Sequence, residues 1–130
     1  MKKLIIILFT LNLFTIACEV QSAKDVEDEK NGTKAKVTFA ELGSVNCIPC
    51  KQMQPVMKAI EEKFGEQVKV IFYDVWTEKG KPYASKYGIK LIPTQVFLDE
   101  NGKEFFRHEG FYPESEIDKL LLSKGLTQKK

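Results

Sequence analysis

The sequence predicts an α/β protein with one mixed sheet of about four to five strands and helices on both faces. Apolar, β-favouring runs alternate with stretches in which apolar residues recur every three or four positions. The last two strand-like runs are separated only by a tight turn. Strands joined through helices tend to run parallel, whereas strands joined by a tight turn run antiparallel, so the sheet is expected to be mixed.

The first half of the folded part predicts a strand, a helix and a second strand. Residues 37–42 form a short apolar run that leads into a loop. Over residues 50–64 the apolar spacing is helical, and Gly65 follows as a C-terminal cap. Pro55 lies inside this helix and is expected to kink it. Residues 68–73 predict the second strand.

The second half predicts a short helix, a hairpin and a final helix. Residues 82–87 suit a short helix, and residues 94–98 suit a third strand. Turn residues at 99–102 connect this strand to a hairpin partner at 103–107. Pro113 suits the first turn of the last helix. The apolar face of that helix consists of Ile117, Leu120 and Leu121.

The front of the chain has the pattern of an export signal. Residues 1–17 begin with two lysines and continue as an apolar run that is shorter than the roughly 20 residues a membrane-spanning helix needs. The run ends at Ala17 and Cys18, and this junction resembles the lipobox of bacterial lipoproteins, in which the cysteine becomes the lipidated N-terminus. Thr15 departs from the leucine usual in that motif. The alternative is an ordinary secretory signal with Cys18 as a free thiol.

Composition separates a polar tether from the folded domain and excludes one class of partner. Residues 18–36 contain almost no apolar side chains beyond the lipid attachment site, which predicts a flexible tether before a domain at 37–130. The whole chain has 20 basic and 18 acidic residues, and removing Lys2 and Lys3 with the signal leaves them equal. A near-neutral chain has no electrostatic footprint for nucleic acid. We expect a monomer.

Two of the three cysteines form a pair separated by two residues, where a loop enters a helix. Three cysteines are too few for a small fold stapled by several disulfides. A structural zinc site needs four ligands, and the further candidates are only Cys18 and His108. His108 is expected to be an ordinary surface residue, so the zinc interpretation lacks ligands. We expect no metal and no cofactor beyond the cysteine pair itself.

The same pair suits a dithiol that opens and closes as a disulfide. The free backbone amides at a helix N-terminus stabilise an anion, so the thiolate of Cys47 is favoured and Cys47 is the candidate nucleophile. Cys50 lies one turn further along and can attack the mixed disulfide that Cys47 forms with a substrate. Between them, Pro49 suits the first positions of a helix, and Ile48 adds no charge. A purely structural disulfide is the alternative.

With these residues the chain resembles the thioredoxin family over about residues 37–122. The matching positions are Cys47, Ile48, Pro49, Cys50 and Lys51 in the active-site motif, Pro55 in the following helix, Ile92, Pro93 and Thr94 in the loop before the third strand, Gly110 and Glu41. The resemblance implies the thioredoxin fold.

The resemblance also implies roles for residues outside the cysteine motif. The bond between Ile92 and Pro93 is expected to be cis, and the loop from Ile92 to Thr94 to bind an extended substrate segment through its backbone. Glu41 takes the position of a buried acid. Burial would raise its pKa and allow it to accept the proton of Cys50. The alternative for Glu41 is a solvated carboxylate at the end of a strand.

Several positions depart from the family pattern. Asn46 stands where a tryptophan commonly precedes the first cysteine, which thins the apolar surface available to partners. Phe72 stands in place of a lysine that often pairs with the buried acid, so Glu41 is expected to be more fully desolvated. Trp76, Tyr83 and Phe111 could supply partner-facing surface instead, or could simply be packed.

Taken together, these features predict an extracytoplasmic thiol:disulfide oxidoreductase that works mainly as a reductase. The side chains of Ile48 and Pro49 bring neither charge nor a hydrogen-bond donor to the thiolate, which favours a reductant. The expected partners are disulfide-containing exported proteins as substrates, a membrane-embedded thiol reductase as electron donor, and the membrane through a lipidated Cys18. The alternatives are a weak oxidase or isomerase, and a non-enzymatic module that binds Cu or Zn.

Overall fold

A computed structural model describes residues 34–130, so the predicted signal peptide at 1–17 and the predicted lipid site at Cys18 lie outside the described residues. The elements are β1 (Val37–Gly43), α1 (Ile48–Phe64), η1 (Gly65–Gln67), β2 (Val68–Asp74), α2 (Lys81–Lys86), β3 (Thr94–Asp99), β4 (Glu104–Glu109) and α3 (Glu114–Ser123). Between residues 34 and 130 no helix is long and apolar enough to cross a membrane.

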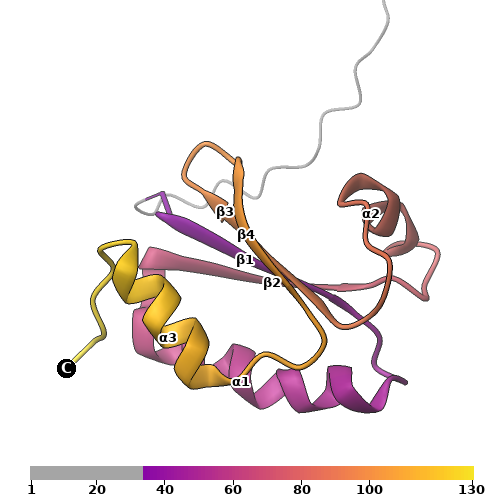
Figure 1. The fold of residues 1–130 in the computed structure, drawn as a ribbon, viewed down its shortest axis with the longest axis horizontal. Coiled ribbons are helices and arrows are strands. Elements are labelled where there is room, and N and C mark those ends of the chain that lie inside the picture. The colour runs from indigo at the N-terminus through magenta and orange to yellow at the C-terminus, as the bar shows by residue number, and fades with distance from the viewer. Residues whose placement is uncertain (1–33) are drawn as a thin grey trace, which may run out of the picture.

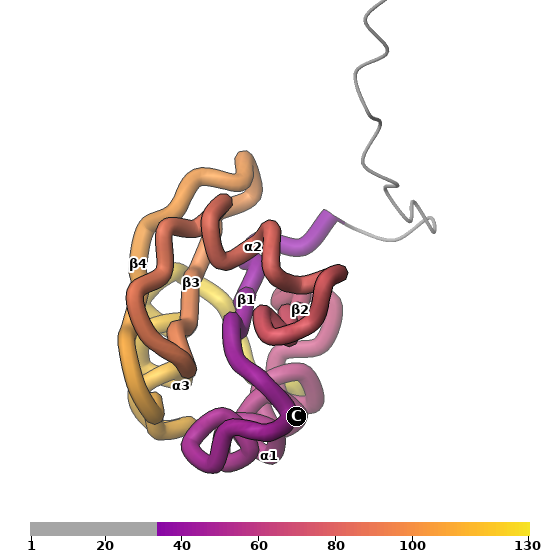
Figure 2. Tube along the Cα trace, turned by 90° about the vertical axis from the view of Figure 1, so that its right-hand side faces the viewer, coloured from indigo at the N-terminus to yellow at the C-terminus, as the bar shows by residue number. Residues whose placement is uncertain are grey.

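The four strands form one mixed sheet in the order β2-β1-β3-β4. Strand β1 pairs parallel with β2 and antiparallel with β3, and β4 pairs antiparallel with β3. Helices α1 and α3 lie on one face of the sheet, and α2 lies on the other (Figure 1). Figure 2 shows the strands in the same order from β4 to β2, with α1 and α3 together below them. The predicted fold class and element order are confirmed.

Each face of the sheet has its own apolar core. On the face covered by α1 and α3, Phe39 and Phe97 are fully buried and stack with ring centroids 4.7 Å apart. The helix side of this core includes Met53, Ile60 and Leu121. A smaller core under α2 contains Ala40, Leu42, Val75 and Val96. Burial on both sides of β1 explains why its sequence is an apolar run without alternation.

Local details differ from the sequence-based expectations at two points, the start of α1 and the pairing of β3 with β4. Helix α1 begins at Ile48, two residues earlier than its apolar periodicity indicates, because Pro49 occupies a first-turn position that requires no amide donor. Pro55 lies inside α1, which continues to Phe64. A register shift between Phe97 and Leu98 interrupts the pairing of β3 with β4. The apolar pattern contains no signal for such a bulge.

The strand registers bring four chain segments to one edge of the sheet. Gly43 at the end of β1 pairs with Asp74 at the end of β2. Thr94 at the start of β3 pairs with Leu42 on one side and with Glu109 on the other. The segments that follow β1, β2 and β4 therefore meet the segment that precedes β3.

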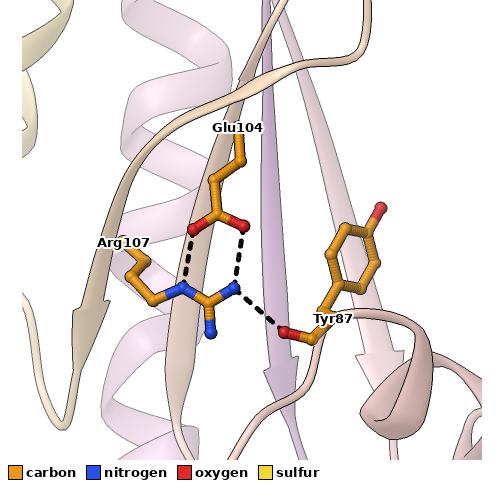
Figure 3. A network of polar contacts seen from close by, with 3 residues as sticks. All are labelled: Tyr87, Glu104 and Arg107. Atoms are coloured by element: carbon orange, nitrogen blue, oxygen red, sulfur yellow. Dashed lines mark hydrogen bonds and ion pairs between the residues drawn. The ribbon is translucent and has the colours of Figure 1, made fainter.

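A polar contact ties α2 to the edge strand β4 (Figure 3). The Arg107 guanidinium donates to both carboxylate oxygens of Glu104, at 2.6 and 2.7 Å, and its Nη2 also donates to the carbonyl of Tyr87 at 2.9 Å. Arg107 thereby lowers the pKa of Glu104. Because Tyr87 caps the C-terminus of α2, this contact holds the start of the segment that leads into β3.

Candidate active site

Cys47 and Cys50 form a disulfide at the start of α1, with their Cα atoms 5.2 Å apart. Cys47 is the N-cap residue and is half-buried, whereas Cys50 lies within the first turn and is fully buried. The first cysteine is therefore the more accessible of the two, and the second is sheltered. Among residues 34–130 no group of three or more potential metal-ligating side chains occurs.

The electrostatics at Cys47 favour a thiolate when the disulfide is open. No side chain caps the N-terminus of α1, and no acidic residue lies in its first turn. The unpaired amides of that turn, together with the helix dipole, therefore face Cys47 without a competing carboxylate. Such surroundings lower a thiol pKa.

A short turn connects β1 to Cys47 and is fastened to the loop after β2. The amide of Cys47 donates to the Ser44 carbonyl at 3.1 Å, and the amide of Asn46 donates to the Ser44 hydroxyl at 3.2 Å. The Asp74 carboxylate accepts from the amides of Val45 at 3.4 Å and Trp76 at 3.1 Å. One carboxylate thus holds two loops together beside the cysteine pair.

The peptide bond between Ile92 and Pro93 is cis, as the family resemblance implies. Pro93 and Thr94 are buried and Ile92 is half-buried, so their side chains are largely packed within the domain. The Pro93 carbonyl accepts from the amide of Gly110 at 2.8 Å. Gly110 has φ 93°, a backbone conformation that side chains rarely adopt, which explains glycine at this position.

Glu41 is fully buried in the middle of the sheet, which confirms the buried acid and excludes a solvated carboxylate. Phe72 flanks it on β2 and Gln95 flanks it on β3. Neither of its carboxylate oxygens has a hydrogen-bond partner among the described residues. Desolvation raises the pKa of Glu41 to about 8, and the Gln95 side chain opposes this effect in part.

The packing around Gly43 places Glu41 beneath the cysteine pair. A Cβ atom at Gly43 would lie 3.2 Å from both Cβ and Sγ of Cys50, and 3.3 Å from the ring of Phe72. Glycine at this position therefore allows α1 to approach the sheet closely. Glu41 lies two residues earlier on the same strand face and is the register partner of Phe72. The acid and the buried sulfur thus share one small region of the core.

Exposed apolar side chains gather around the cysteine pair. Of the six large ones that the described residues expose, five lie on the segments that meet at this sheet edge: Val45, Ile48, Trp76, Leu91 and Phe111. Trp76 is 63 % exposed and Phe111 43 % exposed, so both are available to a partner. Tyr83 in α2 is only half-buried, with its ring stacked on Tyr73 at a centroid distance of 3.8 Å.

Four residues of the site have surroundings that their sequence positions did not indicate. Val45 and Leu91 became part of the exposed apolar group only through the strand register. The Gln95 amide is fully buried. A polar residue within an apolar strand was the feature of the sequence that could have pointed to it. His108, predicted at the surface, is half-buried and stacks on Tyr112 with centroids 4.4 Å apart.

A profile of the thioredoxin-like domain matches residues 23–124. This chain belongs to the thioredoxin-like family. It is 31 % identical over 90 residues to the chloroplastic thioredoxin Y of Oryza sativa subsp. japonica, and the match covers 69 % of this chain and about half (52 %) of that protein. It is 29 % identical over 89 residues to the thioredoxin of Bacillus subtilis strain 168, covering 68 % of this chain and 83 % of that one.

Solved structures agree with this assignment. The N21Q mutant thioredoxin of Halobacterium salinarum NRC-1 superposes with a TM-score of 0.60 at 26 % identity, over 68 % of this chain and 74 % of that one. Fasciola hepatica thioredoxin superposes with a TM-score of 0.59 at 26 % identity, over 69 % and 82 % of the two chains. In this family a CxxC motif at the start of a helix is the redox centre. Cys47 and Cys50 form such a centre at the start of α1, so the domain is a thiol:disulfide oxidoreductase.

The buried acid of this thioredoxin-like domain makes its stability depend on pH. In the native state Glu41 stays protonated up to about pH 8, whereas its ordinary pKa is 4.5. Between these values the unfolded state binds fewer protons, so the contribution of Glu41 to stability falls as pH rises, by about 1.4 kcal/mol per pH unit. Below pH 4.5 and above pH 8 the contribution is constant.

We expect the oxidised protein to lose unfolding free energy from pH 5 to pH 8 and the Glu41→Gln variant to lose less over the same range. Denaturant unfolding at several pH values measures both. Glu62→Gln, an exposed position on α1, is the matched control and should behave as the parent does. Parallel curves for the parent and Glu41→Gln would contradict the raised pKa.

Proposed function

We propose that this protein reduces disulfide bonds in other exported proteins, outside the cytoplasm, through the Cys47 and Cys50 dithiol. The observation that carries the proposal is an accessible sulfur at the N-cap of α1 with a sheltered sulfur one turn behind it. The thiolate of Cys47 attacks one sulfur of the substrate disulfide and displaces the other as a thiolate. A mixed disulfide between Cys47 and the substrate results.

The second step uses Cys50 and Glu41. Cys50 gives its thiol proton to Glu41 in the fraction of molecules in which that carboxyl group is ionised, and the resulting thiolate attacks the Cys47 sulfur. The bond between Cys47 and the substrate then breaks, and the substrate leaves as a thiolate that is protonated from the solvent or from Glu41. Two electrons have passed from the dithiol to the substrate, and the enzyme is left with its own disulfide. A pKa of about 8 suits a group that must both take up and release this proton near neutral pH.

The direction of electron flow follows from what surrounds the nucleophile. Ile48 and Pro49 separate the two cysteines and offer no charge or hydrogen-bond donor from their side chains. Only the helix amides then stabilise the thiolate, which keeps the dithiol reducing. A reductant outside the cytoplasm needs a supply of electrons, for which a membrane-embedded thiol reductase is the partner we infer.

The exposed apolar side chains around Cys47 form the docking surface in this proposal. Ile48 is 75 % exposed directly beside the nucleophile, and Trp76 lies on the neighbouring loop. They replace the apolar surface that is absent at Asn46. The backbone of the loop from Ile92 to Thr94 would align the substrate segment next to them.

The two cysteines should be separable by substitution. Cys47→Ser should abolish insulin disulfide reduction, because it removes the attacking sulfur. Cys50→Ser should accumulate a mixed disulfide with the substrate, visible on a non-reducing gel, because the resolving sulfur is missing. A mixed disulfide that accumulates on Cys47→Ser instead would reverse the assigned roles.

The equilibrium with glutathione tests the direction. We expect a potential near that of thioredoxin, about −270 mV, and a value near the oxidant end, about −120 mV, would make the protein an oxidase or isomerase instead. Stoichiometric Cu or Zn that survives dialysis, without insulin reduction, would favour the metal-binding alternative. Ile48→His is an informative companion variant, because an added donor beside Cys47 should make the potential more oxidising.

The proposed location rests on the sequence in front of the domain. A short basic start, the apolar run to Ala17 and the following Cys18 are the basis for export and lipid anchoring. The polar residues that follow would hold the domain away from the membrane.

Replacing the anchor should release the protein. We expect the parent chain to fractionate with membranes and to incorporate labelled fatty acid in a bacterial host, and Cys18→Ala to lose the label. The Cys47→Ser variant is the control and should keep it. Labelling that persists in Cys18→Ala would contradict lipidation at this residue.

A further inference from the structure

Four side chains form a row across the sheet beneath the cysteine pair. In register order they belong to Phe72 on β2, Glu41 on β1, Gln95 on β3 and His108 on β4. Because neighbours in register point to the same face, all four are directed toward the side covered by α1 and α3. Two of them, Glu41 and Gln95, are polar and fully buried.

Three acceptor oxygens in this row are unpaired. The two carboxylate oxygens of Glu41 and Oε1 of Gln95 are buried without hydrogen-bond partners among the described residues. A buried acceptor left unpaired is costly, so the state in which one of these groups becomes a donor is favoured. When Glu41 is protonated, its O–H group is a donor. The unpaired Oε1 of Gln95, on the neighbouring strand in register with Glu41, is an acceptor for it.

The amide of Gln95 is anchored on its other side. Its Nε2 donates to the carbonyl of Gly110 at 3.0 Å. The amide of Gly110 in turn donates to the carbonyl of Pro93, the cis proline, at 2.8 Å. Gln95 therefore connects the buried acid to the loop assigned to substrate alignment.

We propose that Gln95 is a positioning residue that holds the carboxyl group of Glu41 for proton exchange with Cys50. This proposal rests on the role given to Glu41 under the proposed function. A primary amide can serve both forms of the acid, accepting from the O–H of the neutral group and donating its second N–H to the carboxylate. An aliphatic side chain at the same position can serve neither.

Other titratable groups around Glu41 are few. Cys50 packs from α1 against Gly43, two residues along the same strand face from Glu41, and Phe72 on β2 is apolar. Beyond Gln95 lies His108, which stacks on Tyr112 and contacts the Phe111 carbonyl through Nε2 at 3.2 Å. Burial raises the pKa of Tyr112. Gln95 is thus the polar side chain next to Glu41 in the sheet, and its effect on the carboxyl group is to lower the pKa that burial raises.

The experiment replaces Gln95 with methionine in the full chain. This substitution keeps the length of the side chain and removes its amide group. We expect the titration midpoint of Glu41, followed by carbon-13 NMR of its carboxyl group in the oxidised protein, to move up by about one pH unit. The alkaline rise of insulin reduction with pH should move in the same direction. Gln95→Leu is a second apolar variant, available if methionine impairs folding.

Two comparisons separate positioning from packing. Phe97→Leu alters the same strand face without touching an amide, and it should lower stability while the midpoint of Glu41 stays in place. Gln95→Asn keeps an amide on a shorter side chain, so its Glu41 midpoint should lie between that of the parent and that of Gln95→Met. An unchanged midpoint in both folded apolar variants would overturn the role of Gln95.

The variant Glu41→Gln distinguishes this failure from failure of the proposed function. If the alkaline rise of turnover near pH 8 persists in Glu41→Gln, Glu41 is not the proton acceptor, and the positioning role falls with it. If that dependence disappears in Glu41→Gln but Gln95→Met titrates as the parent does, the catalytic role of Glu41 stands and only the inference about Gln95 fails. In the double variant, Gln95→Met should have no further effect on the pH profile of Glu41→Gln.

Discussion

The site depends on the meeting of the N-terminal end of α1 with the sheet edge at which all four strands begin or end. The free amides of the first turn reach Cys47, and no carboxylate of that turn opposes them. Glycine at position 43 lets the helix approach the strand closely enough for Cys50 to be buried against it. One sulfur is thereby left accessible and the other protected, and this asymmetry is what directs the exchange of a disulfide between two proteins.

The buried carboxyl group of Glu41, beneath this junction, lowers the stability of the fold when it is ionised. A carboxyl group in the middle of the sheet gains nothing for stability once it ionises, because it is removed from water and its oxygens have no hydrogen-bond partner within residues 34–130. The Phe72 side chain adds to the apolar surroundings of Glu41, and the Gln95 amide opposes their effect on its pKa. The cost is consistent with a functional group whose protonation must change during the reaction, since buried acids with perturbed pKa values are concentrated at such sites.

Much of the architecture was predictable because its signals are local. The apolar spacing of α1, the turn residues between β3 and β4, and the cysteine pair before a helix each indicate one structure within a short window. Features that depend on neighbours distant in the chain were not predictable in this way. Tyr83 packs against the smaller core through its stacking on Tyr73, and Leu91 joined the exposed apolar group because β3 begins where β1 ends. The cis bond at Pro93 was expected only from the family resemblance, since an X-Pro bond is usually trans.

By itself the amino-acid sequence determined the order of elements, the chemistry of the cysteine pair and the absence of a strong net charge. These properties reside in residue type and spacing along the chain. Only the tertiary structure decided which side chains surround that pair, and above all that Glu41 is joined in its row by Gln95. Strand register sets such neighbours, and register is the result of packing an entire sheet against its helices, so it has no signature in any single segment.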